Sequence, residues 1–228
     1  MKTIVHSLPE TGSDKATERA RRTYDRGAAR YDLQEWLPEK LAFRKWRKEL
    51  WDLIPDGRVL EVGVGTGRNL KFYHDGLALT AIDFSPKMLS KAQKKAIRLG
   101  LQVDLRLMDV QQLEFEDHAF DSAVSTFVFC SVPEPLRGLS EVLRVLQPGG
   151  RAYFLEHVRS RKAVLGWMMD VMTPLTRRLS GANMNRDTVA NVAAAGFRIL
   201  EVRDLWLDIV KLIVAEKPGR RPKIAVTS

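Results

Sequence analysis

Three glycines alternate with other residues directly after an apolar run: Gly63, Gly65 and Gly67. Glycine lets the backbone approach a ligand closely and adopt conformations that other residues avoid. A second apolar run, Leu77–Asp83, ends on an acid that can accept hydrogen bonds from ribose hydroxyls. Loop and acid together predict a site for a nucleotide-like ligand. The dinucleotide motif G-x-G-x-x-G is excluded, because its third glycine would fall at Arg68.

Two further acids and a histidine follow other predicted strands, where their side chains would face the same crevice. Asp109 ends the run Leu105–Asp109, and Glu156 and His157 fall near the end of the run Ala152–Val158. His157 could act as a general base for an acceptor that arrives protonated. Glu156 could orient this histidine or attract a cationic acceptor. A histidine that is bonded structurally to its neighbours is the alternative.

The elements that would position these residues alternate between strands and helices. One helix is predicted over Pro86–Leu99, with Ser85 as its N-cap and Gly100 at its end. This alternation predicts a doubly wound, mostly parallel α/β sheet, whose ligands collect at the carboxyl ends of its strands. The other predicted elements are helices over 18–54 broken near Asp32–Pro38, a helix over Pro135–Leu146, a helix over Arg161–Met172 interrupted at Pro174, a helix over Asp187–Ala195, and strands over Arg198–Val202 and Ile209–Glu216.

The string Glu61 to Gly67, E-x-G-x-G-x-G, resembles the first motif of the class I S-adenosylmethionine-dependent methyltransferases. The fourth strand, Phe120–Thr126, and the turn Pro148–Gly150 occur in that family's order. The resemblance implies a Rossmann-like sheet of seven strands, with an N-terminal helical cap and a helical insertion after the fifth strand. It also implies S-adenosyl-L-methionine as the cofactor. The residues that it assigns to the cofactor are Glu61, Gly63, Gly65, Gly67, Asp83, Met88, Asp109, Val110 and Thr126.

A segment with two tyrosines near the N-terminus narrows this resemblance. Tyr24 to Asp32 is similar to the Y-D-x-x-A-x-x-Y-D opening of the quinone C-methyltransferases and of bacterial phosphatidylethanolamine N-methyltransferases. In those families this helix covers the cofactor and a tyrosine contacts its carboxylate. The resemblance implies that role for Tyr31, and in second place for Tyr24. The glycine string and the segment Pro174–Leu179 look closest to the phospholipid branch.

The composition limits the classes of protein to which this chain can belong. Its 228 residues suit one α/β domain, which we predict over 18–217, between a loose segment 1–17 and a basic tail 218–228. The absence of a run of eighteen apolar residues and of a secretory signal predicts a cytoplasmic protein. The single cysteine, Cys130, excludes an internal disulfide and any multi-cysteine metal site, and no metal is expected.

Positive charge and apolar residues coincide in segment 159–186, where the resembled family builds substrate pockets. The formal net charge of the chain is +9, and this segment carries six basic residues against one acid. Such a segment favours a lipid-like substrate and peripheral attachment to an anionic membrane, here the inner face of the cell membrane. Segment 39–53 is also amphipathic and basic, and it is expected to contribute to this membrane attachment. The candidate substrate residues are Phe127, Trp167, Arg177, Arg178, Asn183, Asn185 and Arg186.

Three acceptor classes follow from these features. The arginines suit a lipid phosphate, which favours phosphatidylethanolamine N-methylation, whereas C-methylation of a ubiquinone or menaquinone precursor keeps the same fold and cofactor. A nucleic-acid-binding methyltransferase is the third class. It is disfavoured because N-P-P-Y and D-P-P-Y signatures are missing after the fourth strand, and few aromatic residues lie among the basic ones. No nucleic acid is therefore expected as a partner.

Overall fold

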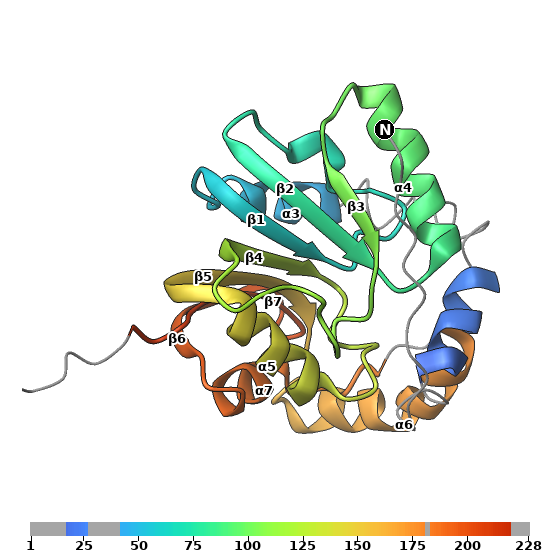
Figure 1. Ribbon diagram of the computed structural model, residues 1–228. Helices are drawn as coiled ribbons and strands as arrows, with labels where there is room; N and C mark the ends of the chain where they lie inside the picture. Colours follow the sequence, from blue (N-terminus) through green and yellow to red (C-terminus); the bar gives the residue numbers. More distant parts are fainter. Residues whose placement is uncertain (1–16, 27–41, 181–182, 220–228) are drawn as a thin grey trace, which may run out of the picture.

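The computed structural model describes residues 17–26, 42–180 and 183–219. Its strands form one seven-stranded sheet in the order β3-β2-β1-β4-β5-β7-β6 (Figure 1). Strand β7 runs in the direction opposite to the other six, so its pairings with β5 and β6 are antiparallel. This confirms the predicted doubly wound, mostly parallel sheet. The strands are β1 Gly57–Val62, β2 Leu77–Asp83, β3 Asp104–Leu107, β4 Phe120–Thr126, β5 Leu146–His157, β6 Arg198–Trp206 and β7 Val210–Glu216.

Helices cover both faces of this sheet. The described helices include α3 Arg44–Trp51, the 3-10 turn η2 Leu70–Phe72, α4 Pro86–Leu99, α5 Pro135–Val145, α6 Ala163–Ser180 and α7 Thr188–Ala194, and residues 17–26 are also helical. Helices α5 and α7 pack on one face, where Leu60 and Phe154 are buried. Helices α3 and α6 pack on the other face against Val59 and Leu155. Successive residues of a strand point to opposite faces of the sheet. Consecutive apolar residues, such as Val59 and Leu60, therefore give the central strands an apolar surface on both faces.

Local signals set the ends of α4 as the sequence predicts. The Ser85 side chain accepts a hydrogen bond from the Met88 amide at 3.2 Å, which caps the helix N-terminus. Gly100 ends the helix in the left-handed conformation, with φ of 68°. Since β2 runs directly into this capped turn, the end of the strand and the start of the helix are fixed relative to each other.

The predicted interruption of the helix after β5 is wrong. Helix α6 is continuous from Ala163 to Ser180, with Pro174 in its interior. A proline removes one backbone donor, here the one that would bond to the Asp170 carbonyl, but it does not end this helix. Hydroxyl groups beside the proline bond back to the helix: the Thr173 hydroxyl donates to the Met169 carbonyl at 2.7 Å, and the Thr176 hydroxyl donates to the Thr173 carbonyl at 3.1 Å.

Other predicted boundaries also differ from the structure, and β6 continues to Trp206 beyond the predicted end at Val202. Strand β5 begins at Leu146 rather than at Ala152, and a register irregularity between Phe120 and Ser122 of β4 accommodates the glycine turn within it. The sequence predicts that the third strand continues to Asp109, but β3 ends at Leu107, so Asp109 lies in the loop after β3. The predicted break at Asp32–Pro38 and residues 1–16 of the predicted loose segment 1–17 lie outside the described residues, whereas Thr17 already belongs to a helix.

Candidate functional site

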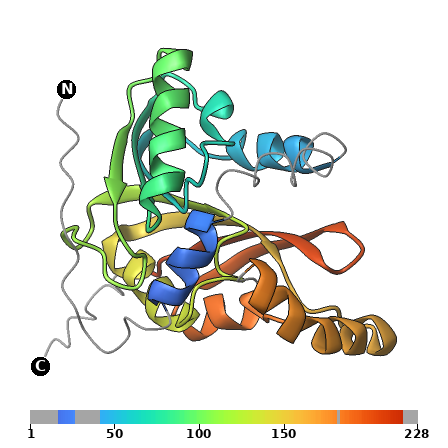
Figure 2. The same ribbon diagram turned by 90° about the vertical axis from the view of Figure 1, so that its right-hand side faces the viewer.

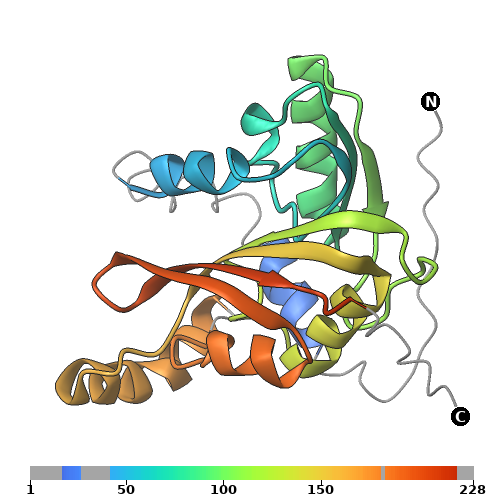
Figure 3. The same ribbon diagram turned by 90° about the vertical axis from the view of Figure 1, so that its left-hand side faces the viewer.

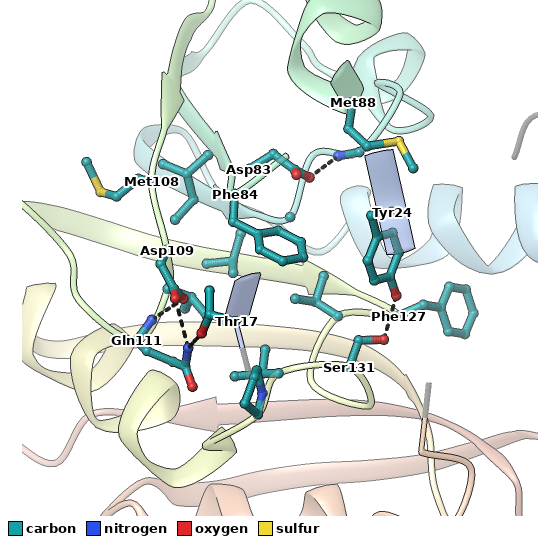
Figure 4. Close-up of a pocket in the computed structure, with 18 of the residues that line it drawn as sticks. Thr17, Tyr24, Asp83, Phe84, Met88, Met108, Asp109, Gln111, Phe127 and Ser131 are labelled. Atoms are coloured by element: carbon teal, nitrogen blue, oxygen red, sulfur yellow. Dashed lines mark hydrogen bonds between the residues drawn. The ribbon is translucent and has the colours of Figure 1, made fainter. Parts of the chain in front are cut away.

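A pocket of about 710 Å³, counted to its open mouth, lies at the carboxyl ends of β1, β2, β3 and β4 (Figure 4). Predicted cofactor residues that line it are Tyr24, Gly63, Gly65, Asp83, Met88, Asp109, Val110 and Thr126, and the predicted substrate residue Phe127 lines it too. The structure therefore brings together residues from four strand ends. Glu61 and Gly67 are not part of the lining.

The glycines after β1 have different surroundings. A Cβ atom at Gly63 would lie 2.4 Å from the Val128 side chain, and one at Gly67 would lie 2.5 Å from Leu70, so both positions are closed by packing. Gly65 has φ of +55° and no heavy atom within 4 Å of where its Cβ would lie. Because Gly65 also lines the pocket, its backbone faces open space that a ligand can occupy.

Asp83, at the end of β2, holds the glycine loop from below the pocket. Its carboxylate accepts the Gly65 amide at 2.8 Å and the Ser85 amide at 2.8 Å. Burial raises the pKa of this carboxyl to about 6, with a smaller contribution from the nearby Asp25. Each carboxylate oxygen has a further lone pair, so Asp83 can still accept hydrogen bonds from ligand hydroxyls.

Glu61 supports the loop from behind and is completely buried. It accepts hydrogen bonds from the side-chain amide of Asn69 at 2.6 Å and from the Tyr73 hydroxyl. The guanidinium of Arg47, on α3, donates to Asn69 at 3.0 Å and to Thr126 at 2.6 Å. Burial raises the pKa of Glu61 to about 7. This network joins α3 to the floor of the pocket, so Glu61 anchors the loop.

The helix of residues 17–26 covers the pocket. Its side chains meet three of the loops that line it: Tyr24 pairs with Ser131 at 2.6 Å, Asp25 accepts from Ser85 at 2.5 Å, and Thr17 accepts from Gln111 at 3.0 Å. Figure 4 shows Tyr24 and Ser131 facing each other at the pocket. The sequence pointed to Tyr24 but not to Thr17 or Gln111. The contact between those two residues spans 94 positions, and no local pattern signals it.

The loop after β4 forms the opposite wall, and Glu156 of β5 fixes it. One oxygen of the buried Glu156 carboxylate accepts from the Ser125 hydroxyl at 2.9 Å and from the amides of Val128 at 3.0 Å and Phe129 at 3.1 Å. Burial raises the pKa of Glu156 to about 7. These bonds hold Phe127 in the left-handed region, with φ of 58°. The carboxylate therefore shapes the wall of the pocket without lining it.

His157 lies behind Phe127. Its ring centroid is 4.6 Å from that of Phe127 and 6.0 Å from that of Phe43. Burial, together with the charge of Arg47, lowers the pKa of His157 to about 4. An imidazole of this kind is neutral at pH 7 and takes up protons weakly, which favours the structural alternative over a general base.

The predicted substrate residues after β5 are not gathered at one point. Asn183 donates to the Cys130 carbonyl through its amide at 2.9 Å and its side chain at 3.1 Å. Arg186 donates to the Val132 carbonyl at 2.7 Å. Both therefore tie the segment after α6 to the loop that lines the pocket. Asn185 donates instead to Asp170 on α6 at 3.2 Å.

The other candidates from the sequence are elsewhere or undescribed. Trp167 is 63% exposed on α6. Arg177 and Arg178 lie in the same helix, but their side chains are outside the described part of the structure. Tyr31 also falls outside the described residues. Pocket residues that the sequence reasoning missed include Phe84 and Met108, each of which directly precedes or follows a predicted acid in the sequence.

No group of three or more His, Cys, Asp or Glu side chains could hold a metal ion within 17–26, 42–180 and 183–219. In those same ranges, no helix combines the length and apolar character that crossing a bilayer requires.

Known proteins resemble this chain in sequence. A family model described as "Methyltransferase domain" matches residues 60–154. A phosphatidylethanolamine N-methyltransferase of Cereibacter sphaeroides is 45% identical over 111 residues, which cover 48% of this chain and 55% of that protein. The chain thus spans about half the length of that relative.

Two other relatives match over longer stretches. The thiol S-methyltransferase TMT1B of Rattus norvegicus is 32% identical over 173 residues, which are 70% of each chain. The ubiquinone/menaquinone biosynthesis C-methyltransferase UbiE of Geotalea daltonii is 28% identical over 230 aligned positions, which cover 88% of this chain and 97% of that protein.

Proposed function

Because this chain belongs to the class I S-adenosylmethionine-dependent methyltransferases, we propose that it methylates the amine of phosphatidylethanolamine at a membrane surface. S-adenosylmethionine, when bound, supplies an electrophilic methyl group on a sulfonium. The observation that carries the choice of acceptor is the 45% identity to a phosphatidylethanolamine N-methyltransferase. We further propose a peripheral attachment at the inner face of the cell membrane, supported by the basic, apolar segment 159–186.

The pocket offers groups that fit each part of this cofactor. Gly65 presents open space to it, and Asp83 can accept from the two ribose hydroxyls. Met88 and Val110 are apolar and buried, and they suit the two faces of an adenine ring. Thr126 accepts bonds from Arg47 and Asn69, so its own hydroxyl hydrogen can point into the pocket.

The contribution of the chain to methyl transfer is one of position and environment. Phe127 forms an apolar aromatic wall beside Thr126, against which an amine can be held out of water. The described residues of the lining include no histidine or lysine; the ionisable ones are two aspartates and a tyrosine. An ammonium has no lone pair, so the acceptor must lose its proton before it attacks. Turnover with an amine should therefore increase with pH.

Label transfer tests the proposal. The protein is incubated with methyl-labelled S-adenosylmethionine and vesicles that contain phosphatidylethanolamine, and the lipids are separated. We expect label in mono- and dimethylated phosphatidylethanolamine. Label in a demethylated quinol or in a small alkyl thiol, with none in phosphatidylethanolamine offered alongside, would overturn the choice of acceptor.

C-methylation of a quinone precursor is the second candidate. It is supported by the alignment with UbiE, which covers 97% of that protein. A quinol has an apolar tail but no phosphate, so it would use the apolar wall and leave the basic residues of segment 159–186 without a role in binding the acceptor. The same labelling experiment separates the two candidates.

A further inference from the structure

Helix α6 carries an exposed apolar stripe. Its members recur at three- and four-residue intervals and are 46–73% exposed: Val164, Trp167, Met168, Val171, Met172 and Leu175. The opposite side of the same helix packs on the protein, where Met169 is 4% exposed within the core beneath the sheet. One side of α6 is thus used for folding, and the other side presents large apolar groups to the surroundings.

The turn between β6 and β7 presents further apolar side chains. Trp206 is 54% exposed and Leu207 is 52% exposed. Leu207 has φ of 50°, a conformation that a branched side chain seldom adopts. A glycine would fit this turn with less strain and without exposing apolar surface. The hairpin apex therefore carries a bulky, exposed apolar residue in a strained backbone conformation.

Asp208 joins the hairpin apex to the start of α6. Its carboxylate accepts from the Ser160 hydroxyl at 2.7 Å and from the Arg161 amide at 2.7 Å. The amide of Val158 also donates to the Ile209 carbonyl at 2.7 Å. Figures 2 and 3 show the hairpin and α6 projecting from the same side of the molecule. The two apolar features consequently belong to one rigid surface.

The segment that carries the α6 stripe has an excess of basic residues, and Asp208 adds one acid at the hairpin apex. Segment 159–180 contains five basic residues and one acid. That acid, Asp170, pairs with Arg159 at 2.7 Å. Arg161 and Lys162 are exposed at the start of α6. A second copy of the chain would bring an equally positive surface and be repelled, whereas an anionic bilayer complements both the charge and the apolar groups.

The described part of the other basic segment, residues 42–53, does not offer a comparable face. In α3 the apolar Leu50 and Trp51 are 0% and 1% exposed. Even Arg47 is 4% exposed, because it supports the pocket. The amphipathic pattern of α3 thus reflects packing on the sheet. Among the described residues of the two segments that the sequence suggested for membrane contact, the exposed large apolar side chains are concentrated on α6, whereas residues 42–53 expose Leu53 alone, at 40%.

We infer that the exposed stripe of α6 and the Trp206–Leu207 apex together form a surface that dips into the headgroup region of an anionic lipid bilayer. Tryptophan is suited to this interface, and basic residues beside it are attracted to anionic lipids. The inference deepens the proposed function and rests on it for the reason why a bilayer is approached. The segment that follows α6 bonds through Asn183 to the loop that lines the pocket, so the surface leads toward the site.

Vesicle binding tests the inference without any turnover. The full chain is sedimented with vesicles of phosphatidylcholine alone or mixed with phosphatidylglycerol. Two double variants are compared, Trp206→Asp with Leu207→Asp and Val164→Asp with Val171→Asp. We expect each to weaken binding to the anionic vesicles by at least about tenfold, because apolar burial is lost and a like charge is added. Circular dichroism and cofactor affinity should stay as in the unchanged protein.

A matched control is available on α4. Ile97 is 73% exposed and lies among Lys94, Lys95 and Arg98, so Ile97→Asp removes an exposed apolar residue from an equally basic setting. We expect it to bind vesicles as the unchanged protein does. Equal loss in Ile97→Asp, or full binding by both double variants, would overturn the inference. So would a dimer in light scattering that the double variants convert to a monomer, since the surface would then bind a second copy.

The inference and the proposed function fail in different ways. If vesicles bind as expected but phosphatidylethanolamine receives no label, the acceptor is wrong and the surface stands. With detergent-dispersed phosphatidylethanolamine, the Trp206→Asp/Leu207→Asp variant should keep its turnover, while turnover on vesicles should fall. Equal loss in both assays would contradict a role in reaching the bilayer.

Discussion

Asp83 both carries a titratable charge at the pocket and holds the glycine loop in place. Its two oxygens accept from the amides of Gly65 and Ser85, so the same carboxylate fixes the glycine loop and the cap of α4. Because it is buried, its pKa is raised to about 6. It is therefore mostly ionised at pH 7 but can be protonated under mildly acidic conditions.

This titration predicts a pH-dependent affinity for S-adenosylmethionine. Below about pH 6 the Asp83 carboxyl is protonated and loses its attraction for the cationic cofactor, whereas above it the carboxylate is ionised. Affinity measured by calorimetry should therefore increase as the pH rises through about 6. Asp83→Asn should weaken binding by roughly 1–3 kcal/mol and remove this dependence. An unchanged pH profile in that variant would contradict the assignment.

Glu156 gives a second prediction at the same scale. Glu156→Ala leaves the amides of Val128 and Phe129 without their acceptor, and should destabilise the protein by about 2–4 kcal/mol in urea unfolding. Glu156→Gln keeps a carbonyl acceptor and should lose much less. In the variants that fold, KM for the acceptor should rise while cofactor affinity changes little, because Phe127 is the wall against which we propose that the acceptor binds. Loss of both affinities in Glu156→Gln would argue against this role.

At the scale of elements, the helix of residues 17–26 is attached by side chains rather than by the sheet. Its bonds reach the loops after β2, β3 and β4, which line the pocket. Helix 17–26 and the segment after α6 both meet the loop after β4, since Tyr24 contacts Ser131 and Asn183 contacts Cys130. The covering helix, the aromatic wall of the pocket and the segment after α6 are therefore all connected through the loop after β4.

Removing one of these attachments should accelerate cofactor release. Tyr24→Phe deletes the hydroxyl that pairs with Ser131, and should weaken S-adenosylmethionine binding by about 0.5–1.5 kcal/mol, mainly through a faster dissociation rate in stopped-flow measurements. Arg22→Ala is a suitable control on the same helix, because it removes only an exposed pair with Glu18. If both variants release the cofactor at the same rate, the cover acts through something other than this bond.

At the scale of the whole molecule, three buried carboxyls surround the pocket. Burial raises the pKa values of Glu61 and Glu156 to about 7 and that of Asp83 to about 6. The folded state thus holds protons that the unfolded chain releases near pH 4. Since stability falls with rising pH wherever the folded state binds more protons, these groups destabilise the cofactor-free protein as the pH rises toward 7.

The Tm of the cofactor-free protein should therefore increase as the pH is lowered from about 8 to about 6. His157, whose pKa is lowered to about 4, opposes this trend only below about pH 6.5, where the unfolded chain takes up a proton. The carboxyls of Asp121 and Glu141, whose pKa values are lowered by arginine partners, lose their contribution only at lower pH still. Scanning calorimetry checks this, and the Glu61→Gln/Glu156→Gln variant should give a flatter profile.

The sequence by itself determined the fold and the position of the pocket. Local signals, such as the caps Ser85 and Gly100, are enough to predict where strands alternate with helices. The glycine loop and Asp83 follow two successive strands of this pattern. Parallel strands bring their carboxyl ends to one edge, so residues far apart in sequence could be assigned to one crevice.

Only the tertiary structure decided which way these residues face and what they touch. Glu61 belongs to the glycine motif but points away from the pocket, and His157 packs behind Phe127 where its pKa falls. The exposure of Trp206 and the burial of Leu50 likewise could not be read from apolar character alone. Burial, pKa and long-range hydrogen bonds depend on which surfaces meet in space, and a local pattern fixes periodicity but not its partner.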